Sequence, residues 1–339
     1  MLGLSSGLVW DASANAYPPI VNPLDIYYMM LWWDFTDTTT LFQEIDSFTT
    51  AADANNDPIG RVKNKALTAQ QQYPWLDDED RLGLFGRAVA DGNRPAFKTG
   101  GANNYGYAQF TGSGSDYLEC KQAAGYGVHS GTSLSDAKVA SNKWTLVVVA
   151  QADAAGDSST TEEICSIQMT DDSDTDKGVK LQVDRRDDGG SDDGDVQLTA
   201  ISTNNDYSSS SITNTLMPGP PNTWNTHMND KLEVRIFSAN YSFASLTVAQ
   251  RGLNQIGGLP GGYDALTAAE GAARIYSFDE SNNDAHFRVG IGHLPSNNRY
   301  FDGKIYEVIF YRGGIPVSVA NGLAWYYADK YGIDIEGAN

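Results

Sequence analysis

The chain has 339 residues, is rich in Gly, Ser, Thr, Asn and Asp, and carries a net charge of −20. This length suffices for one large β domain or two smaller ones. The charge argues against nucleic acid and anionic membranes as partners, and favours divalent cations or a basic partner surface. No run approaches the roughly 18 apolar residues of a membrane-spanning helix, and residues 1–7 lack the features of a secretory signal.

Residues 1–22 contain small residues, two consecutive prolines and no clear period. We predict that they form an arm that docks on a neighbouring subunit, because Gly- and Ser-rich ends need a surface to lie on. Trp10, Tyr17 and Ile20 are the expected anchors. Residues 23–339 show no internal repeat and no dividing linker, so we predict one domain there.

The stretch 27–33 is apolar and of strand length, and several later stretches are short runs of strand-forming residues bounded by turn residues. This pattern is typical of a sandwich of antiparallel sheets. Two long connections, 203–229 and 253–285, are rich in Gly, Asn, Ser and Pro. The expected later strands are 105–110, 143–152, 162–169, 179–184, 196–202, 232–237, 245–250 and 286–292.

The last stretch with a clear secondary-structure pattern runs from Phe301 to Ile333. Residues 304–311 are β-branched or aromatic at nearly every position, which predicts a central strand buried on both faces. A helix is expected to follow Pro316 and to stop at Gly332. Its apolar side is formed by Val319, Leu323, Tyr326, Tyr327 and Tyr331, which fall at helical spacing.

Four stretches together resemble the concanavalin A-like lectin/glucanase superfamily, in its laminin-G-like jelly-roll form. They are LWWDFTDTTTLF, GRVKNKA (a loose match), the segment RPAFKTGGANNYGYAQFTGSGSDYLE, and FDGKIYEVIFYRGGI with LAWYYADKYGI. The resemblance implies an all-β, concanavalin-like jelly-roll sandwich with a short C-terminal helix. It also implies that Asp34 and Asp37 secure the loop after the first strand, since an Asx side chain can cap a turn. The opening MLGLSSGLV resembles the starts of some structural proteins of tailed bacteriophages.

The best metal candidate is the loop TDDSDTDKG, where Asp172, Asp174 and Asp176 alternate. Calcium needs several hard oxygen ligands converging from one turn. The spacing departs from an EF-hand loop, because Gly178 comes one place late and Val183 occupies the position of the bidentate Glu. Calcium binding and a solvated hairpin tip therefore both remain open. A second acidic loop, within 187–195, is expected at the opposite end of the intervening strand.

No catalytic set is complete in the sequence. Glycosidases of this fold need three acids on alternating positions of one strand, and the stretch EIDSFTT offers only Glu44 and Asp46. The four histidines are scattered, and the nucleophile elbow, the phosphate loop and the dinucleotide fingerprint are missing. We therefore expect no enzyme activity, with a glycoside hydrolase as a minor alternative.

Sugar binding stays open, because aromatic rings stack on sugar faces and amides bind hydroxyl groups. The candidate residues, all in long loops, are Tyr207, Trp224, Tyr263 and Asn297. The chain has two cysteines, Cys120 and Cys165, which we expect to be free thiols because nothing indicates an oxidising compartment.

These observations predict a non-enzymatic virion structural protein, a capsid decoration or a tail or fibre component, assembled in the host cytoplasm. Its expected partners are other virion proteins, bound through the arm, further copies of itself, and host glycans. The alternative is a soluble carbohydrate-binding adhesin.

Overall fold

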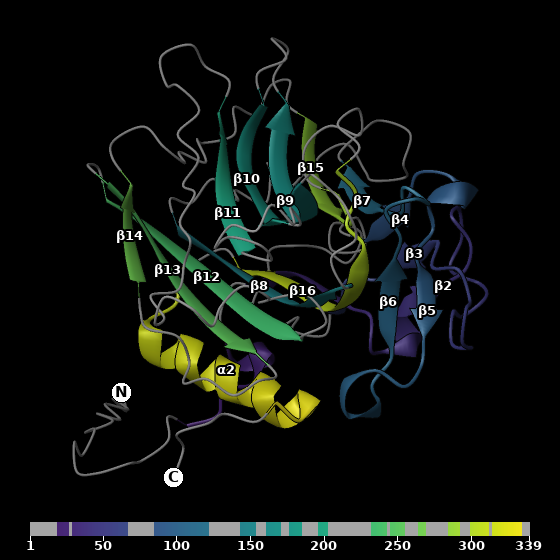
Figure 1. Ribbon diagram of the computed structural model, residues 1–339, viewed down its shortest axis with the longest axis horizontal. Helices are drawn as coiled ribbons and strands as arrows, with labels where there is room; N and C mark the ends of the chain where they lie inside the picture. Colours follow the sequence, from purple (N-terminus) through teal and green to yellow (C-terminus); the bar gives the residue numbers. More distant parts are fainter. Residues whose placement is uncertain are drawn as a thin grey trace, which may run out of the picture.

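A computed structural model describes residues 19–26, 29–66, 85–121, 143–153, 161–170, 176–184, 196–202, 232–242, 245–254, 264–268, 284–291, 299–311 and 314–333. The chain folds into two antiparallel sheets stacked face to face, and a C-terminal helix covers the outer face of one of them (Figure 1). This architecture confirms the predicted all-β, concanavalin-like jelly-roll sandwich. No helix in these ranges is long and apolar enough to cross a membrane.

The first sheet, called sheet A, has eight strands, and its order is not the chain order. Strand β1 (Met29–Asp34) pairs with β16 beside the end of β6, so both share one edge of β16. The other seven strands run in the order β14 (Asp264–Ala268), β13 (Ser245–Asn254), β12 (Glu233–Ser242), β8 (Lys143–Ala152), β16 (Gly303–Tyr311), β6 (Tyr107–Phe110) and β5 (Ala96–Lys98).

The second sheet, called sheet B, also has eight strands. Its order is β11 (Val196–Ser202), β10 (Asp176–Asp184), β9 (Thr161–Thr170), β15 (Asp284–Val289), β7 (Leu118–Lys121), β4 (Gly86–Ala88), β3 (Arg61–Val62) and β2 (Leu41–Phe42). Short 3-10 turns connect several strands. They are η1 (Pro23–Asp25), η2 (Thr38–Thr40), η4 (Asp91–Asn93) and η5 (Ala102–Asn104).

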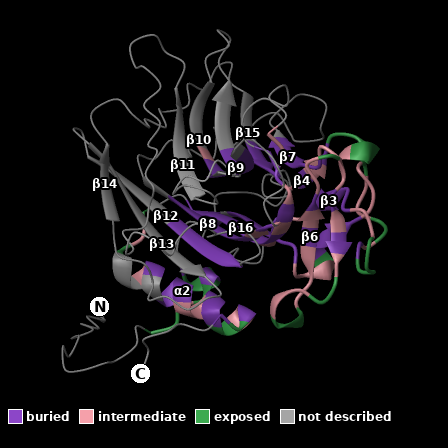
Figure 2. Cartoon of the chain, viewed as in Figure 1, coloured by how far each residue is buried: buried purple, intermediate pink, exposed green. Residues whose placement is uncertain are grey.

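Strand β16 is the centre of sheet A and is buried on both faces, as predicted, except for Lys304 (Figure 2). Neighbouring positions on a strand face opposite sides of the sheet, so β1 and β16 supply two separate cores. Trp33 packs edge-on against Phe287 of sheet B, with ring centroids 5.0 Å apart. Its neighbour Trp32 belongs to the hydrophobic cluster beneath the helix.

The helix α2 (Val317–Tyr331) packs its apolar side on the outer face of sheet A (Figure 1). Leu323, Tyr327 and Tyr331 are almost completely buried there. Gly332 adopts the left-handed conformation with φ of 65° and ends the helix, as its lack of a Cβ permits. The predicted helix, its buried side and its stop are all confirmed.

The segment 19–26 lies across α2 in the same chain. The Val21 N–H donates to the carbonyl of Gly322 at 3.1 Å, and the hydroxyl of Tyr311 donates to the carbonyl of Pro23, also at 3.1 Å. A Cβ at Gly322 would come within 2.5 Å of Val21 and Pro19 atoms, so the close approach requires glycine. The side chain of Ile20 remains 60% exposed.

Predicted strand positions agree with the structure to within a few residues, and β8 and β11 agree at both ends. The short strands β2, β3, β4, β5 and β7 were not among the expected strands. Strand β14 was not expected either, because it lies within the stretch 253–285 that was expected to be a connection. Its five residues, DALTA, include only one β-branched residue. Pairing with β13 therefore places them in the sheet, rather than their own propensity.

Candidate functional site

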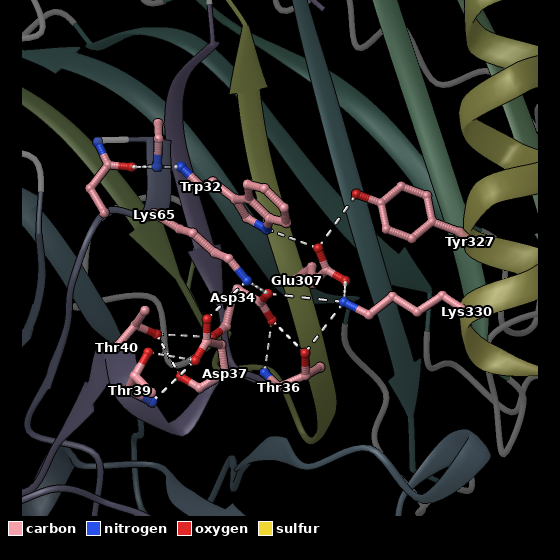
Figure 3. A network of polar contacts seen from close by, with 12 residues as sticks. Trp32, Asp34, Thr36, Asp37, Thr39, Thr40, Lys65, Glu307, Tyr327 and Lys330 are labelled. Carbon is pink, nitrogen blue, oxygen red and sulfur yellow. Dashed lines mark hydrogen bonds and ion pairs between the residues drawn. The ribbon is translucent and has the colours of Figure 1, made fainter. Parts of the chain in front are cut away.

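A network of charged and polar side chains is buried between β1, β16 and α2 (Figure 3). Asp34 on β1 and Glu307 on β16 are cross-strand partners in register. Their side chains are 1% and 0% exposed, respectively. Charged side chains are rarely buried to this degree unless they are paired, so their partners define what the site can do.

Glu307 accepts hydrogen bonds from donors on two elements, β1 and α2. The Trp32 indole N–H donates from β1 at 2.8 Å, and the Tyr327 hydroxyl from α2 at 3.5 Å. One turn further along α2, the Lys330 ammonium and the Tyr331 hydroxyl donate to the other carboxylate oxygen. Glu307 is thereby the point at which the helix, the central strand and the first strand are joined.

Asp34 organises the turn after β1. Its Oδ1 accepts the Thr36 N–H at 2.9 Å and the Thr36 hydroxyl at 2.6 Å, while its Oδ2 accepts the Lys65 ammonium at 2.7 Å. Asp37 repeats the motif, accepting from the Thr39 N–H and hydroxyl at the start of η2. The role that the family resemblance implied for Asp34 and Asp37 is confirmed.

Two lysines balance the buried carboxylates. Lys65 contacts Asp34 and Asp37 at 2.7 and 2.9 Å, and its ammonium lies 4.7 Å from the Trp32 ring centroid. Burial alone would lower the pKa of both lysines, but the adjacent carboxylates outweigh it and raise the pKa of Lys65 and of Lys330. Both ammonium groups are therefore charged at neutral pH.

The ionisation of Glu307 depends on those donors. Burial, reinforced by the charge of Asp34, raises the pKa of Glu307, while Lys330 and Tyr331 oppose the rise. Burial, followed by the charge of Glu307, raises the pKa of Tyr327 and of Tyr331 well above the usual value for a phenol, so both hydroxyls keep their protons and donate. The Glu307 carboxylate is completely buried and is occupied by donors of the same chain. The network is therefore suited to joining elements rather than to acid–base catalysis.

Glu44 and Asp46, the incomplete acid set of the sequence, lie apart from this network. The side chain and N–H of Thr50 hold the pKa of Glu44 at about 2. A general acid needs a pKa near the working pH, so this environment opposes that role. Asp46 forms an ion pair with Arg87 at 2.7 Å and is 85% exposed.

Several predicted site residues fall outside the described ranges. These are the arm anchors Trp10 and Tyr17, the metal candidates Asp172 and Asp174, and the sugar candidates Tyr207, Trp224, Tyr263 and Asn297. Asp176 begins β10 and pairs with Thr170 of β9, and residues 171–175 and 185–195, which hold the rest of the two acidic loops, lie outside the described ranges. Within the described ranges, no group of three His, Cys, Asp or Glu residues could hold a metal ion.

Both cysteines are thiols outside any disulfide, as predicted, and both are buried. Cys120 pairs with Phe287 and Cys165 pairs with Val289, so β15 separates them. Burial, with a smaller contribution from Glu119, raises the pKa of Cys120 to about 12, and burial raises that of Cys165 as well.

The sequence reading missed the Glu307 network. One signal was available, because Glu307 is the one charged residue in the run IYEVIFY. A carboxylate in the middle of a buried strand must find cations or hydrogen-bond donors. The two lysines of the network, Lys65 and Lys330, could not be identified from the sequence, because each lies many positions from the carboxylate that it contacts.

No protein-family model matches this chain, and no curated protein sequence matches it. Among solved structures, it is similar to a GH54 α-L-arabinofuranosidase, with a TM-score of 0.46 and 11% identity over 89% of this chain and 63% of that chain. It is similar to the CBM40 of a Ruminococcus gnavus sialidase (TM-score 0.35, 13% identity, 54% of this chain and 83% of that one). It is also similar to a Trypanosoma rangeli sialidase (TM-score 0.35, 10% identity, 70% and 30%). Similarities this distant carry no argument about function.

Proposed function

We propose that the chain is a non-enzymatic structural protein of a virus particle of the tailed-phage kind. In this proposal, residues 1–22 dock on other virion proteins or on further copies of the chain. The β-sandwich faces outward, where it can contact host glycans.

The arrangement of residues 19–26 carries this proposal. The backbone contacts of Val21 and Pro23 fix the segment on α2 and β16. They leave Ile20 as the most exposed of the three large hydrophobic side chains that are exposed in the described parts of the chain. A fixed segment with an exposed apolar side chain suits a point from which an arm reaches a partner, since exposed apolar surface often marks an interaction site.

The sealed Glu307 network supports the non-enzymatic part of the proposal. Its carboxylates bind lysine, tyrosine and tryptophan groups of the same chain, and Glu307 is completely buried. The resemblance of the opening MLGLSSGLV to the starts of some structural proteins of tailed bacteriophages supports the virion assignment.

The proposal is tested by deleting residues 1–22. Because the described part of this segment, residues 19–22, contacts α2 and forms no strand, the truncated chain should still fold, with a β-type circular dichroism spectrum, but should lose its assembly. The measurement is the mass in solution by light scattering, followed by incorporation into particles. A truncated chain that keeps the mass and incorporation of the full chain would refute the proposal.

The second candidate is a soluble carbohydrate-binding adhesin. The observation that favours it is a partly exposed set of aromatic and amide side chains on sheet A, described below. An adhesin would bind sugar as a monomer, with or without residues 1–22.

A further inference from the structure

Five side chains form a polar and aromatic area on the outer face of sheet A, beyond the end of α2. They are Tyr107 and Gln109 on β6, Gln151 on β8, Asp153 just after β8, and Lys304 on β16, and we call them the outer-face patch. Lys304 is in register with Gln109 on one side and with Gln151 on the other. Paired residues of antiparallel strands project to the same face, so these three form one row across the sheet.

The alternation of burial places the patch on the outer face. Ala108, Ile305 and Ala152 are completely buried, whereas the intervening Gln109, Lys304 and Gln151 are partly exposed. Tyr306, two positions after Lys304, belongs to the cluster beneath α2. The patch therefore continues the face that α2 covers, at the point where the helix no longer shields it.

The Tyr107 ring is held in place from below. Its centroid lies 5.4 Å from that of Tyr306, which packs in turn 5.3 Å from Tyr331 of α2. The Tyr306 hydroxyl accepts the N–H of Ala102, which begins η5. A Cβ at the adjacent Gly101 would come within 2.7 Å of both tyrosines, so glycine is needed for this packing. The ring is thus a rigid platform, and a rigid platform loses little entropy on binding.

The polar groups around the platform are partly oriented and partly unused. The Gln109 amide donates to Asp153 at 2.9 Å and to the Gly303 carbonyl at 3.2 Å. The Lys304 ammonium lies over the Tyr107 ring, 5.6 Å from its centroid, and 3.4 Å from Gln151 Oε1, so a sugar that stacks there would take the place of this flexible side chain. Within the described parts of the chain, no hydrogen bond engages the Tyr107 hydroxyl, Gln109 Oε1 or Gln151 Nε2.

These groups match the chemistry of a sugar ring. An aromatic face packs on the C–H side of a pyranose, while amide and hydroxyl groups can both donate to and accept from sugar hydroxyls. Burial, followed by the charge of Asp153, raises the pKa of Tyr107, so its hydroxyl stays neutral. Lys304 and Asp153 balance each other in charge, and the net charge of −20 repels polyanions.

We propose that the outer-face patch binds a neutral oligosaccharide, with Tyr107 as the stacking platform and Gln109, Gln151 and Lys304 as hydroxyl-binding groups. This inference deepens the glycan contact of the proposed function and rests on it. It places sugar recognition on the sheet face, whereas the sequence reading placed it on Tyr207, Trp224, Tyr263 and Asn297 in the long loops.

The test is binding of the full chain to immobilised oligosaccharides of neutral hexoses and N-acetylhexosamines, with sialylated and sulfated glycans alongside. Tyr107→Ala should weaken binding to a neutral glycan by about tenfold, a loss of ~1.4 kcal/mol, because it removes the platform. Tyr107→Phe keeps the ring and should retain most of the binding. Tyr326→Ala, which removes a partly buried tyrosine of α2 outside the patch, is the matched control and should bind as the wild type does.

Gln151→Ala is a second patch variant, which keeps the test decisive where Tyr107→Ala does not fold. It should fold normally, because within the described residues the Gln151 side chain makes only a long hydrogen bond of 3.4 Å to Lys304. It should weaken sugar binding severalfold while the melting temperature stays at the wild-type value. The proposal is overturned if the wild type binds no neutral oligosaccharide, if it binds only anionic glycans, or if Tyr107→Ala and Gln151→Ala bind normally.

The mass in solution separates this proposal from the assembly role. Patch variants should keep the mass of the wild type, whereas deletion of residues 1–22 should lower the mass without changing sugar affinity per chain. Normal sugar binding by the patch variants, together with loss of assembly on truncation, would refute the patch and leave the assembly role standing. Unchanged mass on truncation, together with weaker sugar binding by the patch variants, would refute the assembly role and leave the sugar-binding patch standing.

Discussion

Replacing Glu307 by Gln should strongly destabilise the protein, because it removes the acceptor that joins α2 to sheet A. The variant amide keeps one carbonyl oxygen, which cannot serve all of the donors on Trp32, Lys330 and Tyr331. It also introduces an N–H₂ group among those donors. The Lys330 ammonium, whose side chain is only 12% exposed, would then keep the Thr36 hydroxyl at 3.3 Å and, as its nearest remaining carboxylate partner, Asp34 at 3.9 Å.

The magnitude follows from the burial. Removing one partner of a buried ion pair costs roughly 3–5 kcal/mol, because the remaining charge is left uncompensated. Glu307 is completely buried and Lys330 nearly so, so we expect a loss within that range. Lys330→Met should cost less, since Glu307, whose pKa burial already raises, can take up a proton.

The assay is the free energy of unfolding from urea titrations followed by tryptophan fluorescence, for the wild type, both single variants and the double variant. The double variant Glu307→Gln/Lys330→Met should lose less than the sum of the two single losses, because neither charge is then stranded. Asp329→Asn makes the same acid-to-amide change at an exposed position of α2 and should leave the unfolding midpoint nearly unchanged. A loss below about 1 kcal/mol for Glu307→Gln, as measured for most exposed ion pairs, would refute this account of the network.

Three further predictions concern other groups. Cys120 and Cys165 should not react with a thiol reagent in the native protein and should both react in guanidinium, because burial raises the pKa of both thiols; rapid native labelling would contradict this. The Glu44 carboxyl should titrate near pH 2 by NMR, and closer to its ordinary pKa of 4.5 in Thr50→Val. Because its pKa is lowered in the folded protein, its contribution to stability is present above pH 4.5 and is lost as the pH falls toward 2. A wild-type titration at the ordinary pKa would refute the role assigned to Thr50. If the loop around Asp174 binds calcium, calorimetry should detect binding that Asp174→Asn weakens; no heat above a chelator control favours a plain hairpin tip.

The sequence predicted the fold where one residue pattern determines the structure. Strand β16 and helix α2 follow from an apolar run, helical spacing and Gly332, and β8 follows from KWTLVVVAQA. The Asx turns at Asp34 and Asp37 are local, because each bonds residues two positions away. Such features are contained within a few consecutive residues.

What the sequence did not predict depends on contacts between distant segments. Lys65 meets Asp34 across 31 positions and Lys330 meets Glu307 across 23. The outer-face patch combines β6, β8 and β16, whose register no local pattern specifies. Even β14 forms because β13 offers an edge to pair with. Periodicity carries no information about these partners.

The central claim is that the segment beside α2 presents an arm to a partner. The most direct test is the mass in solution of the full chain, measured by light scattering for the wild type, Ile20→Asp and Val89→Asp. Ile20 and Val89 are exposed by 60% and 40%, so both variants add one charge to an exposed site and should fold. We predict an oligomer for the wild type and Val89→Asp, and a monomer for Ile20→Asp. A wild-type monomer, or an oligomer that Ile20→Asp leaves intact, would contradict the account.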